Sequence, residues 1–176
     1  MRFAPTGLDG LFVVEPQRLE DDRGSFARVF CSEEFAAAGL PIAFPQCNIS
    51  VNRRRGTLRG LHWQDEPHPE GKLVRCTRGA IWDVAVDLRP HSPTFCRWFG
   101  LDLTAANGRT LYIPPGFAHG FQALEDDAEV FYQMTESYRS DLSRGAPWND
   151  PAFSIAWPLP DPILSLRDAA HPAFRP

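Results

Sequence analysis

Apolar and polar residues alternate along this chain in short stretches, separated by turns at intervals of about 8 to 12 residues. The clearest alternation is at 81–88, where Trp82, Val84, Val86 and Leu88 share one side. A period of two is that of a β-strand with one apolar face. We expect that face to lie in the core.

Seventeen prolines and thirteen glycines supply the turns between further short stretches. Other strands are predicted at 11–16, 25–30, 41–51, 56–64, 72–76, 97–103, 110–113 and 130–135. A series of short strands with little helix is typical of an antiparallel sandwich or barrel. The sequence therefore predicts an all-β fold.

One short helix is expected in the N-terminal half. Ser32 resembles an N-cap, Glu33 and Glu34 suit a first turn, and Gly39 suits the C-terminal end. From residue 138 onward, with seven prolines after position 146, we expect an irregular C-terminal tail that wraps the body and covers its own aromatic side chains.

Composition narrows the classes of function. A chain of 176 residues suits one domain, 1–176, and a net charge of −4 gives no general attraction to nucleic acid or to an anionic membrane. No apolar run approaches the roughly 20 residues of a membrane span, and the first thirty residues do not resemble a signal peptide. We expect a soluble, cytoplasmic protein.

The cysteines form no CxxC pair, which disfavours a structural zinc site and a disulfide framework. We interpret all four as reduced, mostly buried thiols: Cys31, Cys47, Cys76 and Cys96.

Candidate chemistry is concentrated at 56–64, where a cation, a base and an amide follow Gly56: Arg59, His62 and Gln64. Strict alternation places His62 and Gln64 on one face and Arg59 on the other. A single histidine in a strand is more often structural than catalytic, so its neighbours decide its role. A second histidine, His119, is expected within a rigid turn at 114–121.

A polar face is also predicted at 41–51, where Gln46, Asn48 and Ser50 share the same side of a strand. This face either lines a cavity or is the solvent side of an edge strand. Both alternatives are open from the residues alone.

Two motifs resemble those of the cupin family, a jelly-roll of two antiparallel sheets. Gly56, His62 and Gln64 resemble the first motif. Gly108, Pro114, Gly116 and His119 resemble the second. In metal-dependent cupins the first motif supplies two histidines and a glutamate, but here Gln64 replaces one histidine and Glu70 is displaced. Two imidazoles alone are a poor metal site, so we predict no catalytic metal.

The resemblance is strongest to one metal-independent cupin family, the dTDP-4-dehydrorhamnose 3,5-epimerases, and it covers nearly the whole chain. The similar motifs are Arg23-Gly24 with Phe26, Gln46 with Asn48 and Ser50, Leu58–His62, Lys72–Val74, Asp83–Asp87, Ser92–Thr94, Pro115–Phe121, Tyr132, Thr135-Glu136, Trp148–Pro151, and Leu164-Ser165 with Asp168. The resemblance implies a cofactor-free epimerase that inverts C3 and C5 of dTDP-4-dehydro-6-deoxyglucose and gives dTDP-4-dehydrorhamnose.

The family resemblance also implies residue roles. His62 is the expected base, with Asp168 as its carboxylate partner. Lys72 is expected to stabilise negative charge on O4, and Tyr132 is the expected acid on the opposite face. A structural core tyrosine is the alternative for Tyr132.

Substrate binding is assigned in the same way. Arg23 and Arg59 are expected to bind the diphosphate, with Arg23 reaching across a homodimer from the neighbouring chain. The other expected contacts are Phe26, Gln46, Asn48, His119 and Arg167. Because Arg59 and His62 alternate to opposite faces, a bulge or twist at Gly60 is predicted to bring both toward one cavity.

Four positions depart from what is common in the family: Arg28 and Ser143 replace glutamates, Trp63 replaces Tyr or Phe, and Arg167 replaces a lysine. The departures leave open a relative that acts on another nucleotide sugar or inverts only one carbon. Two competing hypotheses are a metal-dependent cupin dioxygenase or isomerase and a cupin that only binds a nucleotide sugar.

Overall fold

Residues 1–175 are described by a computed structural model, and their fold is all-β, as predicted. A six-stranded antiparallel sheet has the order β1-β2-β10-β7-β12-β5, and a five-stranded sheet has the order β13-β6-β11-β8-β9. The strands of the first sheet are β1 (Arg2–Pro5), β2 (Phe12–Glu15), β10 (Thr110–Ile113), β7 (Lys72–Arg78), β12 (Ala128–Met134) and β5 (Gln46–Asn52). Those of the second are β13 (Ser143–Gly145), β6 (Leu58–Gln64), β11 (Phe117–Ala123), β8 (Ala80–Asp87) and β9 (Trp98–Thr104).

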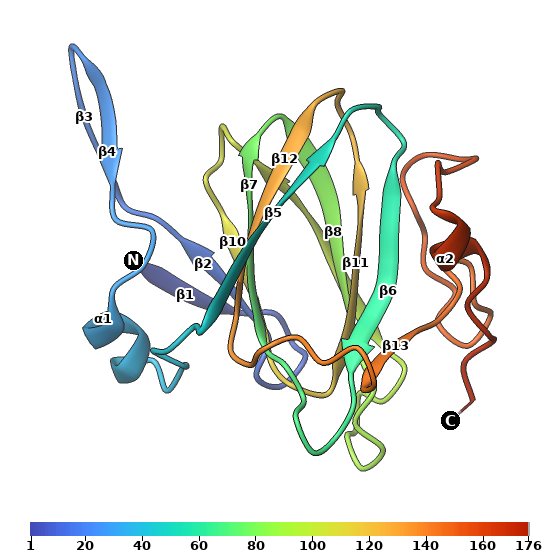
Figure 1. Cartoon of the computed structure of the whole chain (residues 1–176). Coiled ribbons are helices and arrows are strands. Elements are labelled where there is room, and N and C mark those ends of the chain that lie inside the picture. Colours follow the sequence, from blue (N-terminus) through green and yellow to red (C-terminus); the bar gives the residue numbers. More distant parts are fainter. Residues whose placement is uncertain (176) are drawn as a thin grey trace.

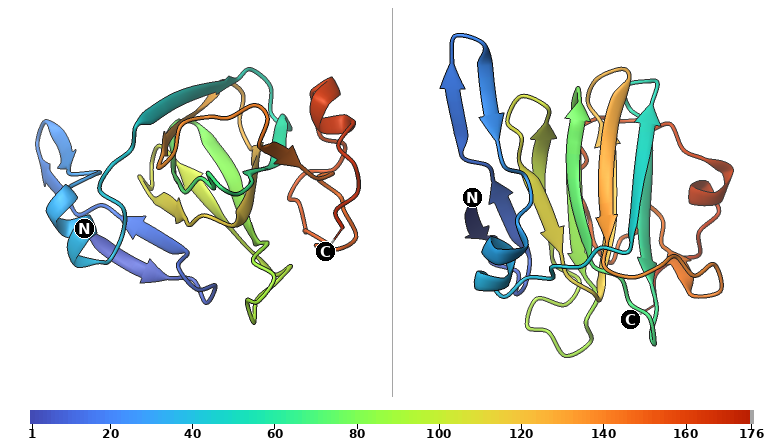
Figure 2. Two further views of the ribbon diagram at one scale, coloured as in Figure 1. Left: turned by 60° about the horizontal axis from the view of Figure 1, so that its bottom comes forward. Right: turned by 60° about the vertical axis from the view of Figure 1, so that its left-hand side comes forward.

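The two sheets face each other and form a cupin-like jelly-roll (Figures 1 and 2). Side chains from both sheets fill the space between them, among them Ile81, Ala85, Leu111, Phe121 and Val130. Each of these is at most 1% exposed. Burial of large apolar side chains of this kind contributes about 1.5 to 3 kcal/mol each, so this core is the main source of stability.

Strand β8 is buried on both faces, which corrects the expectation of a single core face. Ile81 and Ala85 face the space between the sheets, whereas Val84 and Val86 pack under the C-terminal segment against Phe153 and its neighbours. Beyond β13, the C-terminal segment lies outside the five-stranded sheet (Figure 2), so the predicted wrapping is confirmed. The segment from residue 138 is not wholly irregular, because it contains β13 and a short helix at Leu166–Ala169. The less apolar face of β8, which carries Asp83, therefore faces the interior.

The N-terminal part forms a hairpin and a short helix. The hairpin of β3 (Arg18–Asp21) and β4 (Gly24–Ala27) projects from the body (Figure 1). Helix α1 (Ser32–Ala37) is present as predicted, but its N-cap is Cys31 rather than Ser32. Gly39 follows the last turn with φ +71°, a conformation that suits glycine and ends the helix there.

Two further expectations were wrong. His119 lies within β11, not in a turn, because the strand starts directly after the Pro114–Gly116 turn, at Phe117. The cysteines are not mostly buried: Cys76 is buried, Cys31 and Cys96 are partly so, and Cys47 is exposed on the edge strand β5. All four are free thiols. Over residues 1–175, no helix is long and apolar enough to cross a membrane.

Candidate active site

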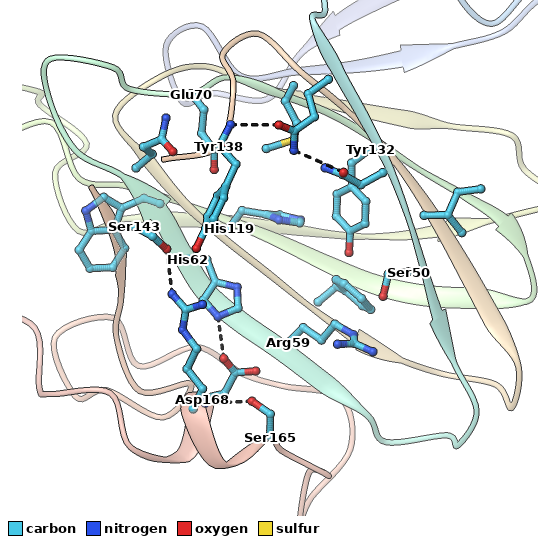
Figure 3. Close-up of a pocket in the computed structure, with 18 residues that line it drawn as sticks. Ser50, Arg59, His62, Glu70, His119, Tyr132, Tyr138, Ser143, Ser165 and Asp168 are labelled. Carbon is cyan, nitrogen blue, oxygen red and sulfur yellow. Dashed lines mark hydrogen bonds and ion pairs between the residues drawn. The ribbon is translucent and has the colours of Figure 1, made fainter. Parts of the chain in front are cut away.

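A cavity of about 420 Å³ opens between the two sheets (Figure 3). Its walls come from β5, β6, β11 and β12 and from helix α2 (Leu166–Ala169). The lining includes Gln46, Asn48, Ser50, Arg59, His62, Glu70, His119, Tyr132, Tyr138, Ser143, Arg167 and Asp168. The polar face of β5 therefore lines a cavity, which decides between the two alternatives that the sequence left open.

A bulge in β6 brings Arg59 and His62 to the same cavity, as predicted at Gly60. His62 pairs with His119 and Arg59 pairs with Phe121, so two residues of β6 lie opposite the single residue Gly120. Gly60 has φ +128°, and a Cβ atom there would lie 2.6 Å from the Gly120 Cα. Only glycine fits this position, because both the backbone conformation and the close approach exclude a side chain.

His62 is paired with Asp168, as the resemblance implied. The Nε2 atom of His62 lies 2.6 Å from Asp168 Oδ1. Burial acts to raise the pKa of Asp168, but the hydrogen bond and the charge of His62 outweigh it and lower that pKa. Asp168 is therefore a carboxylate, so His62 Nε2 carries the hydrogen and donates it. The other ring nitrogen, Nδ1, is the one left to act as a base.

Helix α2, which carries Asp168, was not predicted. Ser165 is its N-cap, and the Ser165 hydroxyl accepts a hydrogen bond of 3.0 Å from the Asp168 backbone nitrogen. The spacing of Ser165 and Asp168 is that of a capping box, a sequence signal that could have identified the helix. The cap fixes the start of α2 and thereby the direction of the Asp168 side chain.

Tyr132 belongs to β12 and therefore approaches the cavity from the sheet opposite His62 (Figure 3). Its ring packs against those of His119 and Phe121, with centroids 6.1 and 6.3 Å away. Burial raises the pKa of the Tyr132 phenol, with partial opposition from Ser50 and Arg59. The phenol is thus protonated at neutral pH and can donate a proton from the wall that faces the base.

His119 also has a carboxylate partner, which the sequence analysis missed. His119 Nε2 lies 2.8 Å from Asp83 Oδ1, and both side chains are buried. Burial raises the pKa of Asp83, and its Oδ2 atom has no hydrogen-bond partner among residues 1–175. The sequence signal that could have identified this partner is Asp83 itself, an acid within the alternating stretch 81–88. Its face of the strand lies in the interior.

Lys72 is buried and its Nζ atom pairs with the Glu70 carboxylate. Burial lowers the pKa of Lys72, and the negative charge of Glu70 opposes that change. Glu70 lines the cavity, whereas Lys72 is not among its lining residues. The sequence analysis considered Glu70 only as a displaced metal ligand and missed this pairing. The role of Lys72 at O4 stays a prediction.

Two guanidinium groups line the cavity. Arg59 Nε donates to Asn52 Oδ1 at 2.8 Å, and Arg167 Nη2 donates to Ser143 Oγ at 2.9 Å. Two of the departures from the family, Ser143 and Arg167, are thus in direct contact. Because a hydroxyl replaces a carboxylate there, the Arg167 charge is not neutralised by its partner and suits an anionic ligand.

Arg23 and Phe26 are not brought to the cavity of their own chain. Both lie on the projecting hairpin, where the Arg23 side chain is 90% exposed and Phe26 is 71% exposed. Arg23 forms an ion pair with Asp21. Arg28 is likewise remote from the cavity and pairs with Glu34 at 2.9 Å.

Comparison with known proteins gives the same family over nearly the whole chain. The family model described as dTDP-4-dehydrorhamnose 3,5-epimerase matches residues 5–176. A dTDP-4-dehydrorhamnose 3,5-epimerase from Methanothermobacter thermautotrophicus is 48% identical over 170 residues, which cover 95% of this chain and 91% of the relative.

Solved structures agree. The crystal structure of dTDP-4-dehydrorhamnose 3,5-epimerase from Elizabethkingia anophelis superposes with a TM-score of 0.95 at 40% identity and covers 99% of this chain and 96% of its own. An epimerase from Legionella pneumophila, solved in complex with dTDP-4-keto-L-rhamnose, has a TM-score of 0.91 at 38% identity and covers 97% and 90%. With its jelly-roll, its His62–Asp168 pair and these relatives, the chain belongs to the dTDP-4-dehydrorhamnose 3,5-epimerase family.

Proposed function

We propose that this epimerase inverts C3 and C5 of dTDP-4-dehydro-6-deoxyglucose and so forms dTDP-4-dehydrorhamnose. The observation that carries the proposal is the position of a histidine–carboxylate pair and a protonated phenol on opposite walls of one cavity. Inversion next to a ketone requires removal of a proton from one face and delivery of a proton to the other. A base and an acid on facing walls meet that requirement.

Each inversion begins at a carbon next to the C4 ketone. The C–H bond breaks as His62 Nδ1 takes the proton. The electron pair of that bond forms the double bond of an enolate, whose negative charge lies on O4. The imidazolium that forms is stabilised by the Asp168 carboxylate at Nε2. Tyr132 then donates its proton to the opposite face of the same carbon, and the carbonyl is restored.

A second inversion needs both groups in their starting states. His62 must lose the proton that it took, and Tyr132 must regain the one that it gave. His62 is 37% exposed, so exchange of its proton with solvent is open. No electron leaves or enters over the cycle, so the residues of this chain suffice for the proton transfers and no redox cofactor is required.

Substrate binding follows from the polar lining. Arg59 and Arg167 supply positive charge for the diphosphate, and their planar groups match its oxygens. Gln46, Asn48 and His119 are assigned to the sugar and the nucleotide. The cavity is within the range of about 300 to 1,000 Å³ that holds small ligands.

Arg23 and Phe26 would act on the cavity of a second chain. Their hairpin projects from the body and exposes an aromatic ring that its own chain does not cover. The homodimer that this arrangement requires, the single domain and the cytoplasmic location all stay predictions.

The test is exchange in deuterated water. Wild-type protein incubated with dTDP-4-dehydro-6-deoxyglucose should place deuterium at both C3 and C5. Label at one carbon would identify an epimerase of one centre, and label at neither would refute the proposal. His62→Asn should abolish exchange at both carbons.

Three tyrosine variants separate the acid from other phenols. Tyr132→Phe should still exchange, because His62 can return a proton to the face from which it came, but it should not invert. Tyr138 also lines the cavity, so Tyr138→Phe tests the other candidate acid, whereas Tyr112→Phe alters a buried phenol outside the cavity. Loss of inversion in Tyr138→Phe, with inversion retained in Tyr132→Phe, would reassign the acid.

A further inference from the structure

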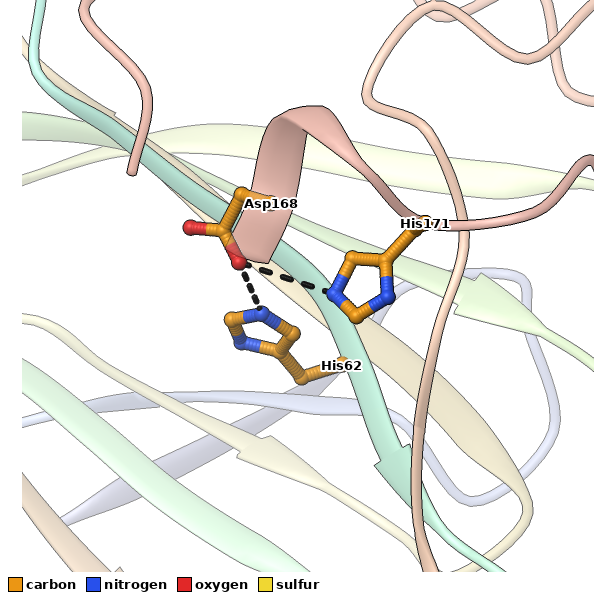
Figure 4. A group of neighbouring side chains, drawn as sticks. All are labelled: His62, Asp168 and His171. Atoms are coloured by element: carbon orange, nitrogen blue, oxygen red, sulfur yellow. Dashed lines mark hydrogen bonds and ion pairs between the residues drawn. The ribbon is translucent and has the colours of Figure 1, made fainter. Parts of the chain in front are cut away.

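A third titratable side chain, His171, stands beside the catalytic pair, and the mechanism does not use it. It follows α2 by two residues and shares Asp168 with His62 (Figure 4). The Nε2 atoms of both rings face the same carboxylate oxygen, Asp168 Oδ1, at 2.6 Å for His62 and 3.6 Å for His171. The two rings meet edge to face with centroids 5.5 Å apart.

The inner nitrogen of His171 makes no hydrogen bond in the described part of the chain, although it faces Asp168. Its side chain is 10% exposed, and Nε2 is buried without a hydrogen bond among residues 1–175. A buried polar atom of this kind normally costs free energy unless something binds it. The ring is also closely packed, since a Cβ atom on Gly145 of β13 would lie 2.3 Å from the same nitrogen. The nitrogen is therefore held in place, facing Asp168.

We propose that His62, Asp168 and His171 form a binding site for a transition-metal ion of the zinc class, and that occupation of this site inhibits the epimerase. The ligand atoms of the three residues all lie within 4.8 Å of one another. Two imidazoles and one carboxylate are a ligand set that zinc uses, with a fourth position open. Magnesium and calcium prefer sites built from oxygen atoms alone.

One of the two distances to Asp168 already suits a tetrahedral ion, and the other requires a small movement of His62. Bonds of about 2.0 to 2.1 Å place neighbouring ligand atoms about 3.3 Å apart. The 3.6 Å between His171 Nε2 and Asp168 Oδ1 is already close to that value, whereas the 2.6 Å between His62 Nε2 and Asp168 Oδ1 must widen by about 0.7 Å. The His62 side chain is 37% exposed and can make this small movement more easily than Asp168 and His171, which are 6% and 10% exposed.

Inhibition follows from the tautomer of His62. A metal ion on Nε2 takes the place of the hydrogen that this atom donates to Asp168. The ring stays neutral if that hydrogen moves to Nδ1, and Nδ1 then has no lone pair for the substrate proton. The inhibition rests on the proposed function, in which Nδ1 is the base. The binding of the ion does not depend on that function.

Binding is tested directly on metal-free protein. Equilibrium dialysis with Zn²⁺, and the visible absorption of added Co²⁺, should show one tightly bound ion per chain in four-coordinate geometry. His171→Gln, and the smaller His171→Asn, should weaken binding by roughly tenfold or more, because one of three ligands is lost. His91→Gln, which changes an exposed histidine in the loop after β8, is the matched control and should bind as the wild type does.

Inhibition is tested by zinc titration of the exchange reaction. Zinc should stop exchange in the wild type, a chelator should restore it, and His171→Gln should need roughly tenfold more zinc, relative to its own metal-free rate. Absence of binding to the wild type, or equal binding by folded His171→Gln, would overturn the site. Binding without inhibition would overturn the inhibitory role. A chain with no epimerase activity would refute the proposed function but leave the dialysis result valid.

Discussion

Replacement of Asp168 by asparagine isolates the contribution of one negative charge to catalysis. The two side chains have nearly the same shape, and the asparagine carbonyl can still accept the hydrogen from His62 Nε2. The substitution removes the charge that stabilises the imidazolium and replaces the second carboxylate oxygen by an amide donor. The Asp168→Asn variant should therefore fold normally and bind substrate, but deprotonate it slowly.

The magnitude follows from the geometry. An Nε2–Oδ1 distance of 2.6 Å places the two charge centres about 4 Å apart, where opposite charges interact by about 4 kcal/mol at an effective dielectric constant of about 20. His62 is 37% exposed, so solvent screening reduces the value to about 2 to 3 kcal/mol. At about 1.4 kcal/mol per factor of ten, kcat should fall roughly 30- to 150-fold.

The assay is the rate of deuterium incorporation at C3 and C5, followed by NMR over a range of substrate concentrations. The value of kcat should fall and KM should change little, because the charge matters after the proton has moved. Asp161→Asn, at an exposed acid earlier in the same C-terminal segment, is the control and should behave as the wild type does. A kcat of Asp168→Asn within about twofold of the wild type would refute the role of the carboxylate, since the estimate requires at least a 30-fold loss.

Three other perturbations test the site and the fold. Lys72→Met should lower kcat by about 10²- to 10³-fold if the ammonium stabilises O4. If it only neutralises Glu70, the double variant with Glu70→Gln should recover most of the lost rate, and steady-state kinetics of the two variants distinguish these roles. The Asp87 carboxylate accepts hydrogen bonds from the side chains of Arg89, Ser92 and Thr94. These bonds lower the pKa of Asp87 and outweigh burial, which acts to raise it. Asp87→Ala should therefore lower the free energy of unfolding, measured in urea, by about 3 kcal/mol at pH 7. Because the pKa is lower in the folded state, the charged carboxylate stabilises the fold at pH values above its unfolded-state pKa of about 3.9. The difference in unfolding free energy between Asp87→Ala and the wild type should therefore narrow as the pH falls below about 4. A difference that stays constant with pH would contradict the assignment. If Arg23 serves the cavity of a second chain, mixing and re-forming dimers from Arg23→Ala and His62→Ala protein should restore activity, because one cavity per mixed dimer is then intact. No recovery would contradict a contribution of Arg23 to the neighbouring chain's cavity.

Local patterns in the sequence were enough to predict most strands and the helix α1. Period-two alternation, proline and glycine describe the backbone over a few residues, and strands form on that scale. The bulge at Gly60 was also predictable, because Arg59 and His62 could reach one cavity only if the alternation was interrupted. Motif resemblance gave the family and the candidate residues His62, Tyr132 and Asp168, which line the cavity.

Tertiary structure decided which faces and which partners those residues have. An alternating strand has two faces, and only the packing of sheets and tail shows that the Asp83 face of β8 is interior. His62 and Asp168 are 106 positions apart, and no local period relates residues so distant. The contact of the His171 ring with that of His62 likewise depends on how the C-terminal segment packs against β6, because the two residues are far apart in the sequence. Sequence therefore determined the elements and the chemical groups, whereas the assembly of two sheets and a tail determined which groups meet.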